Sequence, residues 1–168
     1  MRARNFVETG DLVAPLDLPK GELNVARFIY AYGDMLAARH DAAKANSALS
    51  SLESLHSILV QNYPKEHPDD DQSMPWVDLA LLQAKGIAAL ANGRQTEGIT
   101  ILRDAAAKEK ALPKVFGPPQ LQKPGWELLG DELLAAGDKA GAAAAYRQSL
   151  ELQPGRRLSL AGLDKATH

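Results

Sequence analysis

Hydrophobic residues recur along most of the chain at separations of three and four positions, which is the periodicity of an amphipathic α-helix. Near the C-terminus, Trp126, Leu129 and Leu133 form one such stripe, and Tyr146 and Leu150 extend another. The alternation of apolar and polar residues that marks a half-buried strand does not extend over a useful length anywhere. The pattern therefore predicts an all-α fold.

Interruptions of this pattern divide the chain into helices. Glycine and proline end helices, and aspartate often begins them, so the positions of these residues give approximate bounds. The predicted helices span residues 22–39, 42–61, 75–91, 96–110, 125–136, 139–152 and 157–167. Taken in order, they form pairs over about 22–61, 75–110 and 125–152, and the last helix has no partner and is expected to cap the domain.

Two proline-rich inserts separate the helix pairs. They cover residues 63–75 (YPKEHPDDDQSMP) and 112–124 (LPKVFGPPQLQKP). Proline breaks the helical hydrogen-bond ladder, so both inserts are expected to be irregular. We expect residues 1–168 to form a single domain.

One helix pair carries a specific motif. Its residues stand at the spacing W-x2-L-G-x2-[large], then A-x3-[aromatic], then P, and they are Trp126, Leu129, Gly130, Leu133, Ala142, Tyr146 and Pro154. This spacing resembles the signature of the tetratricopeptide repeat (TPR). The resemblance implies two antiparallel helices that bury their apolar faces by stacking on neighbouring pairs.

Weaker copies of the motif appear when the frame is moved along the chain. Gly86 takes the position of Gly130, and Gly98 takes the position of Ala142. In the first pair, Gly33 and Ala45 occupy the equivalent positions. The resemblance thus implies a right-handed α-α superhelix, a TPR-like solenoid of about three helix pairs plus a C-terminal capping helix.

The second half also resembles the C-terminal region of a group of longer bacterial TPR proteins. The likeness runs over residues 78–166, in segments such as ALANGR and AYRQSLELQPGR. Residues 23–55 resemble, less specifically, the helix pair that precedes this region. We therefore expect the chain to be a C-terminal domain of this kind or a short member of the group.

The concave surface of such a stack is the expected binding site. The groove is predicted to be lined by Tyr30, Asp34, Gln83, Ile87, Glu127, Asp131 and Leu134. Its mixture of carboxylates and apolar groups suggests a partner with some positive charge.

TPR modules that bind the carboxylate tails of chaperones use basic and asparagine side chains in this groove. The equivalent positions here hold Tyr30, Asp34, Ala84, Pro124 and Leu128. The sequence therefore lacks that tail-binding set.

Two functional hypotheses remain open at this stage. The first is a protein-protein interaction scaffold that binds a peptide or a helix in the groove. The alternative is an oligomerisation or substrate-positioning domain of a larger protein, which predicts homo-oligomers or contacts with another domain. The two differ in whether groove residues contact a foreign segment or a second copy.

Composition narrows the classes of partner. The 168 residues carry a net charge of −2, with a pI of about 6.1, so the chain lacks the basic character of a nucleic-acid-binding protein. There is no cysteine, which excludes disulfides and thiolate metal ligands. No apolar run is long enough for a membrane span or a signal peptide, and the compartment stays undetermined.

Candidate catalytic and metal-binding residues are sparse. His67 with Asp69, Asp70 and Asp71 forms the densest group of ligand-like side chains, but its spacing does not fit an EF-hand, and a solvated acidic linker is the favoured interpretation. The serines of segment 47–57 stand in no G-x-S-x-G motif. We therefore predict no catalytic residue, metal or cofactor, and a chain that is not an enzyme.

Two further features are weaker. His40 is expected to be a structural residue at a helix C-terminal turn, near helix carbonyls, and His56 is expected to be a packed, hydrogen-bonded side chain. Basic residues gather loosely around the second insert and offer at most a weak patch for an anionic partner; they are Arg94, Arg103, Lys108, Lys110, Lys114 and Lys123.

Overall fold

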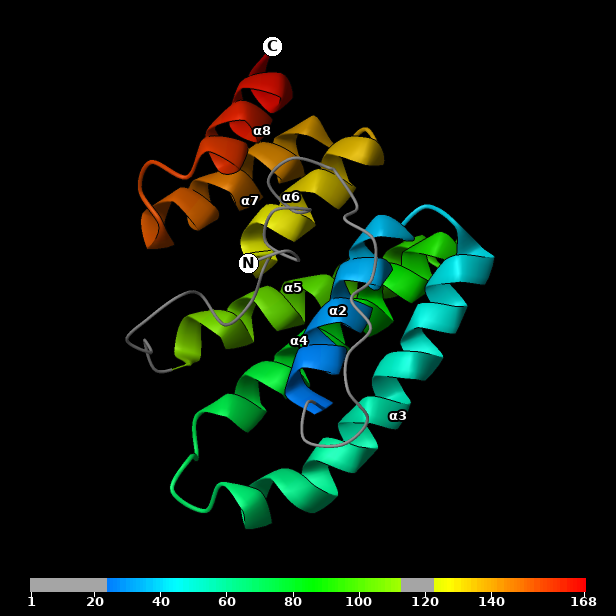
Figure 1. Cartoon of the computed structure of the whole chain (residues 1–168). Helices are drawn as coiled ribbons and strands as arrows, with labels where there is room; N and C mark the ends of the chain where they lie inside the picture. Colours follow the sequence, from blue (N-terminus) through cyan, green and yellow to red (C-terminus); the bar gives the residue numbers. More distant parts are fainter. Residues whose placement is uncertain (1–23, 113–122) are drawn as a thin grey trace.

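The computed structural model describes residues 24–112 and 123–168, and within these ranges it contains helices and no strands (Figure 1). The helices are α2 (Asn24–Ala37), α3 (Ala42–Glu66), α4 (Ser73–Ala91), α5 (Gln95–Ala111), α6 (Gly125–Ala135), α7 (Lys139–Leu152) and α8 (Arg157–Thr167). The all-α prediction is confirmed for this part of the chain.

The predicted bounds of α7 and α8 match the structure, and those of α4, α5 and α6 differ by one or two residues. Residues 22–23 of the first predicted helix lie outside the described residues, as does most of the second insert, over 113–122.

The largest correction concerns α3, which continues to Glu66 instead of ending at residue 61. Pro64 lies inside its last turn and cannot donate a backbone hydrogen bond. Helical hydrogen bonding nevertheless continues past Pro64, because the amide of His67 donates to the carbonyl of Tyr63 at 2.8 Å. The irregular insert therefore shrinks to residues 67–72.

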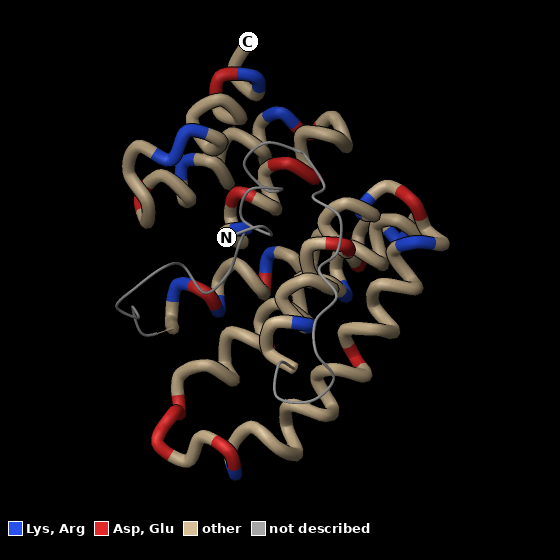
Figure 2. The backbone as a smooth tube through the Cα atoms, in the orientation of Figure 1, with Lys and Arg blue, Asp and Glu red and all other residues tan. Residues whose placement is uncertain are grey.

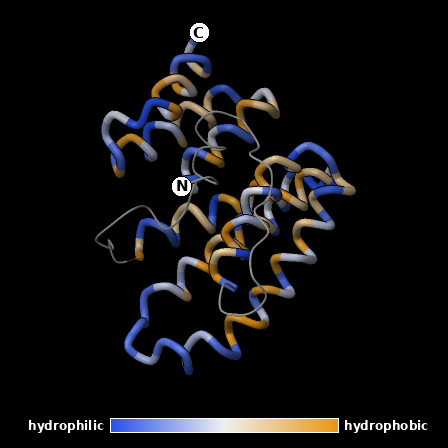
Figure 3. Tube along the Cα trace, in the orientation of Figure 1, coloured by the Kyte–Doolittle hydropathy of each residue, from blue (hydrophilic) through white to orange (hydrophobic). Residues whose placement is uncertain are grey.

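Each helix packs on the next one along the chain, and α2 also packs on α4 while α6 packs on α8. Helix α4 is the most deeply enclosed, since it contacts α2, α3 and α5 and buries ten of its nineteen residues. By contrast α3 buries only Ala45, Leu52 and Leu59, a single stripe along its length. Short hydrophobic runs recur along the helices, and the turn between α3 and α4 is hydrophilic (Figure 3).

Small residues set the closest helix crossings. A Cβ atom on Gly86 would lie 2.7 Å from the Leu102 side chain, and one on Gly130 would lie 2.8 Å from the Tyr146 ring. The two contacts join residues with the same separation along the chain, so the frame that aligned Gly86 with Gly130 predicted equivalent packing. A Cβ atom on Gly162 of α8 would also meet the Tyr146 ring, at 2.3 Å.

The turns after α4 and α6 share one geometry. Gly93 and Gly137 have φ values of 76° and 83°, a region that glycine adopts without steric cost. In each turn the following amide reaches back five residues: Arg94 donates to the carbonyl of Ala89 and Asp138 donates to that of Leu133, both at 2.9 Å. These are Schellman motifs, and they reverse the chain within a few residues.

Acidic residues gather at the turn between α3 and α4 (Figure 2). Here Asp70 accepts hydrogen bonds from the backbone amides of Gln72 and Ser73, the Ser73 hydroxyl and the Tyr63 hydroxyl. The bonds from Tyr63 and Ser73 lower the pKa of Asp70 to about 2. This carboxylate ties the end of α3 to the start of α4.

None of the described helices has the length and apolar character needed to cross a bilayer.

Candidate functional site

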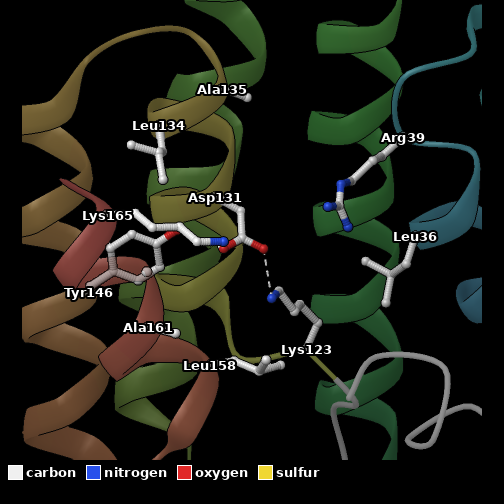
Figure 4. Close-up of a pocket in the computed structure, with 11 residues that line it drawn as sticks. Leu36, Arg39, Lys123, Asp131, Leu134, Ala135, Tyr146, Leu158, Ala161 and Lys165 are labelled. Carbon is white, nitrogen blue, oxygen red and sulfur yellow. Dashed lines mark hydrogen bonds and ion pairs between the residues drawn. The ribbon is translucent and has the colours of Figure 1, made fainter. Parts of the chain in front are cut away.

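A pocket opens where α2, α6, α7 and α8 converge, with a volume of about 480 Å³ (Figure 4). It is lined by Leu36, Arg39, Lys123, Asp131, Leu134, Ala135, Tyr146, Leu158, Ala161, Gly162 and Lys165. The lining comes from segments far apart in the sequence, so the pocket exists only in the folded arrangement that brings the end of α2 near α6–α8.

Three cations and one carboxylate face this pocket. Arg39 and Leu36 extend from one wall, and Lys165 extends from the opposite wall toward the same space (Figure 4). Lys123 and Asp131 lie between them. The remaining lining is apolar, apart from the Tyr146 hydroxyl, so the pocket combines hydrophobic contact area with an excess of positive charge.

Asp131 is neutralised within the fold. Its carboxylate accepts from the Lys123 ammonium at 2.7 Å and from the Tyr146 hydroxyl at 2.8 Å. Burial, and then the neighbouring Asp131 charge, hold the pKa of Tyr146 far above its usual value, so the phenol stays protonated. Asp131 therefore attracts a positively charged partner less than an isolated carboxylate would.

Glu127 lies behind the pocket and connects the pocket residue Lys123 to α8. Its side chain is fully buried, and it receives Arg156 through Nε at 2.6 Å and Nη2 at 2.9 Å, Lys123 at 2.9 Å, and the Ser159 hydroxyl at 2.6 Å. Burial raises the pKa of Glu127, but the bonds from Arg156 and Lys123 outweigh it, and the net pKa lies below the ordinary value. This charge network fixes Lys123 at the pocket floor and α8 at its wall.

Arg39 has a second acidic neighbour behind the pocket. Its Nε atom lies 3.5 Å from Oε1 of Glu132, whose side chain is 6% exposed. Burial raises the pKa of Glu132 to about 7, although the Arg39 charge opposes the shift. Oε1 of Glu132 has no hydrogen-bond partner among the described residues. Arg39 is thus only weakly held by this carboxyl group.

A second buried glutamate lies at the joint between α5 and α6. The Glu109 carboxylate accepts the backbone amide of Gly125, the first residue of α6. Burial raises the pKa of Glu109 to about 7, against the opposing effects of this hydrogen bond and of Arg156. The C-terminal helices are therefore joined to the rest of the stack through ionisable groups.

The structure corrects the predicted groove. Gln83, Ile87 and Glu127 are 0% exposed and cannot contact a ligand on an open surface. Gln83 instead accepts from the Tyr32 hydroxyl and donates to the Lys123 carbonyl, and Glu127 belongs to the charge network described above. The sequence pattern placed them on a concave face without accounting for the neighbouring helices that cover that face.

The remaining groove residues divide into two groups. Asp131 and Leu134 line the pocket as the prediction requires. Asp34 is exposed and Tyr30 is half-buried, both on α2, and neither lines the pocket. The predicted preference of the groove for a positively charged partner stays a prediction, although the cations that line this pocket outnumber its carboxylates.

Other candidates from the sequence have structural partners. His56 pairs with Asp78 at 2.6 Å, and Arg39 donates to His40 at 3.1 Å. In the described ranges, His, Cys, Asp and Glu side chains form no group of three or more that could hold a metal ion.

Sequence reasoning missed Arg39, Lys165 and Arg156. Arg39 and Lys165 lie near helix C-termini, where basic residues are common because they interact favourably with the helix dipole, and Arg156 immediately precedes α8. Lys123 was included only in a loose basic patch around the second insert. The signal that was available is the i, i+4, i+8 spacing of Lys123, Glu127 and Asp131, which puts opposite charges on one helical face.

Comparison with known proteins gives no match for this chain among protein-family descriptions, curated proteins or solved structures.

Proposed function

We propose that the chain is a protein-interaction module, a short TPR-like right-handed superhelix that binds a peptide segment of another protein in the pocket between α2 and α6–α8. The single observation that carries this proposal is the pocket itself, because it combines apolar walls with side-chain charges and is formed by helices from both ends of the chain. The proposal includes no catalytic step.

Two features of the fold support the TPR-like part of the proposal. Consecutive helices pack in chain order, and first helices of successive pairs also touch, as α2 touches α4. The equivalent glycine contacts at Gly86 and Gly130 are what repeated units produce. Right-handed stacking of such units creates a concave face that presents peptide-binding surfaces.

The size and chemistry of the pocket favour a peptide. A volume of about 480 Å³ holds a few side chains of a partner segment. Leu36, Leu134 and Leu158 supply apolar contacts from three different helices. Recognition by anchoring side chains in a groove between helices is a common mode of peptide binding.

The test is selection of a displayed library of random peptides on the purified chain, compared with a variant whose pocket is filled. Ala161 is exposed and lines the pocket, so Ala161→Trp fills the space without entering the core. Ala144→Trp, on an exposed part of α7 outside the pocket, is the matched control. The proposal predicts peptides that bind the wild-type chain and Ala144→Trp but not Ala161→Trp.

Two results count against the proposal. The first is the absence of any peptide whose binding depends on the pocket. The second is self-association of the chain that Ala161→Trp abolishes, measured by light scattering over a range of concentrations. That result supports the oligomerisation alternative.

A further inference from the structure

The cations of the pocket differ in how completely the fold satisfies them. Lys123 is 6% exposed and bridges Glu127 and Asp131 at 2.9 and 2.7 Å, so its charge is used within the protein. Lys165 is exposed on the last turn of α8 and makes no ion pair with the described residues. Lys165 is therefore available to a ligand.

Arg39 is the second available cation. Its Nε atom donates to His40 and lies 3.5 Å from Glu132, and its two terminal nitrogens make no hydrogen bond to the described residues. The guanidinium points into the pocket from the turn after α2 (Figure 4). A guanidinium with two terminal nitrogens to offer suits a carboxylate, which accepts two parallel hydrogen bonds from it.

The negative groups near this pair are weak competitors. Asp131 already accepts from Lys123 and Tyr146. Glu132 lies at 3.5 Å from Arg39, and its raised pKa of about 7 leaves it partly uncharged at neutral pH. The free positive charge of the pocket thus comes from Arg39 and Lys165, on facing walls.

We infer that the pocket holds an acidic side chain of the bound peptide, with the carboxylate of an Asp or Glu residue between Arg39, in the turn after α2, and Lys165 on α8. The inference rests on the proposed function and specifies its ligand as an acidic protein segment with flanking apolar residues. These residues pack against the leucines of the pocket walls. The carboxylate also links the turn after α2 to α8, so binding stabilises the folded arrangement that forms the pocket.

The experiment uses the pocket-dependent peptides recovered by the library selection. Each is synthesised with a fluorescein label in two versions, one as selected and one with every Asp and Glu replaced by Asn and Gln. Binding to the full chain is measured by fluorescence anisotropy. The acidic version is expected to bind about tenfold or more tightly than its amide version, as charge-assisted hydrogen bonds imply.

Variants of the protein test the two cations directly. Arg39→Gln and Lys165→Gln are each expected to weaken binding of the acidic peptide about tenfold and leave binding of the amide peptide unchanged. Lys139→Gln removes an exposed charge outside the pocket and is expected to change neither. Glu132→Gln removes the carboxyl group that competes for Arg39 and is expected to strengthen binding of the acidic peptide.

The outcomes separate this inference from the proposed function. Pocket-dependent peptides that are neutral or basic, or that bind equally well as amides, overturn the acidic ligand and leave the interaction module in place. A loss of binding in Lys139→Gln equal to that in Lys165→Gln also overturns it, because the effect then comes from net charge alone. Circular dichroism of each variant verifies that the helices are intact.

Discussion

The two halves of the molecule are held together in different ways. Helices α2–α5 meet through small and apolar residues, and the crossing of α4 and α5 is so close that Gly86 and Gly98 have no room for a Cβ atom. Helices α6–α8 meet around the buried Glu127, which binds Lys123 and Arg156. Both halves contain close crossings at glycines, but only the second half adds a buried network of charges to them.

This difference has a functional consequence, because the pocket lies mainly in the charge-paired half. A buried ionic network contributes little net stability but fixes the geometry of its members, and it fails when one member is removed. An apolar interface tolerates small changes by repacking. The pocket is therefore expected to be more sensitive to single substitutions than the core of α2–α5.

The largest effect is expected from Glu127→Gln. The change keeps the size of the side chain but removes the charge that Lys123 and Arg156 share, and leaves Lys123 with Asp131 alone, at a cost of about 3–5 kcal/mol. Glu97→Gln, which breaks the exposed pair with Arg94, is the control and is expected to cost less than about 1 kcal/mol. The measurement is the free energy of unfolding in urea.

The two tryptophans allow the halves to be followed separately. Trp76 lies on α4 and Trp126 on α6, so Trp→Phe variants that retain one tryptophan report one half each. In Glu127→Gln the Trp126 signal is expected to change at lower urea concentration than the Trp76 signal, since stacked helical pairs lose cooperativity when one interface weakens. Coincident transitions with an unchanged midpoint contradict the role given to Glu127.

The second prediction is a pH dependence. The pKa of Glu132 is raised from 4.5 to about 7 in the folded chain, so its contribution to stability is fully present below about pH 4.5 and is lost as the pH rises through 7. Glu132→Gln removes this loss and is expected to stabilise the chain by on the order of 1–3 kcal/mol at pH 8, with almost no difference at pH 4.5. Thermal unfolding between these pH values measures it.

The difference in stability between Glu132→Gln and the wild-type chain reports on Glu132 alone, because the other carboxyl groups titrate in both proteins. Asp70 acts in the opposite direction: its pKa is lowered to about 2, so its contribution is present above the unfolded pKa and disappears in acid. A difference between Glu132→Gln and wild type that is constant from pH 4.5 to 8 contradicts the prediction.

The third prediction concerns the apolar half. A Cβ atom on Gly98 would lie 2.9 Å from the carbonyl oxygen of Gly86 and 2.5 Å from the Leu90 side chain. Gly98→Ala is therefore expected to push α4 and α5 apart, and the cost of overpacking exceeds the gain in helix propensity by about 1–2 kcal/mol. Ala107→Leu, on an exposed position of the same helix, is expected to change the free energy of unfolding by less than about 0.5 kcal/mol.

The sequence predicted the features that depend on local periodicity. The bounds of α7 and α8 follow from residue spacing within one or two helices, and so does the alignment of Gly86 with Gly130, two positions where the structure leaves no room for a Cβ atom. The end of α3 was wrong because Pro64 was assumed to stop the helix, whereas a proline in the last turn costs only one hydrogen bond.

The site was harder to predict, because its residues are brought together by contacts between distant helices. Glu127 was expected in an open groove, since a polar residue on an amphipathic helix is normally exposed. Its burial depends on Arg156 and Ser159, which follow much later in the chain. Arg39 and Lys165 carry no local signal at all, and only the stacking of α2 near α8 places both in one pocket.

The smallest expected effects come from the helix N-caps, where α7 of the second half and α5 of the first half differ. Asp138 caps α7, and its side chain accepts the Gly141 amide at 2.8 Å. Arg94 occupies the equivalent position before α5, at φ −85° and ψ 65° against −79° and 76° for Asp138, and it makes no side-chain cap hydrogen bond. Asp138→Ala is therefore expected to cost about 1 kcal/mol.

Adding an N-cap to α5, instead of removing one from α7, is the stricter test of the difference between these two caps. Arg94→Ser introduces a hydroxyl that caps α5, with Glu97 three residues later to complete a capping box. It removes only an exposed ion pair and is expected to stabilise the chain by about 0.5–1 kcal/mol in urea unfolding. The two cap positions have nearly the same backbone angles, so a serine hydroxyl at residue 94 is placed to cap the helix. If Arg94→Ser destabilises the chain, the ion pair between Arg94 and Glu97 contributes more than an N-cap does. Surface charges then stabilise the first half as well.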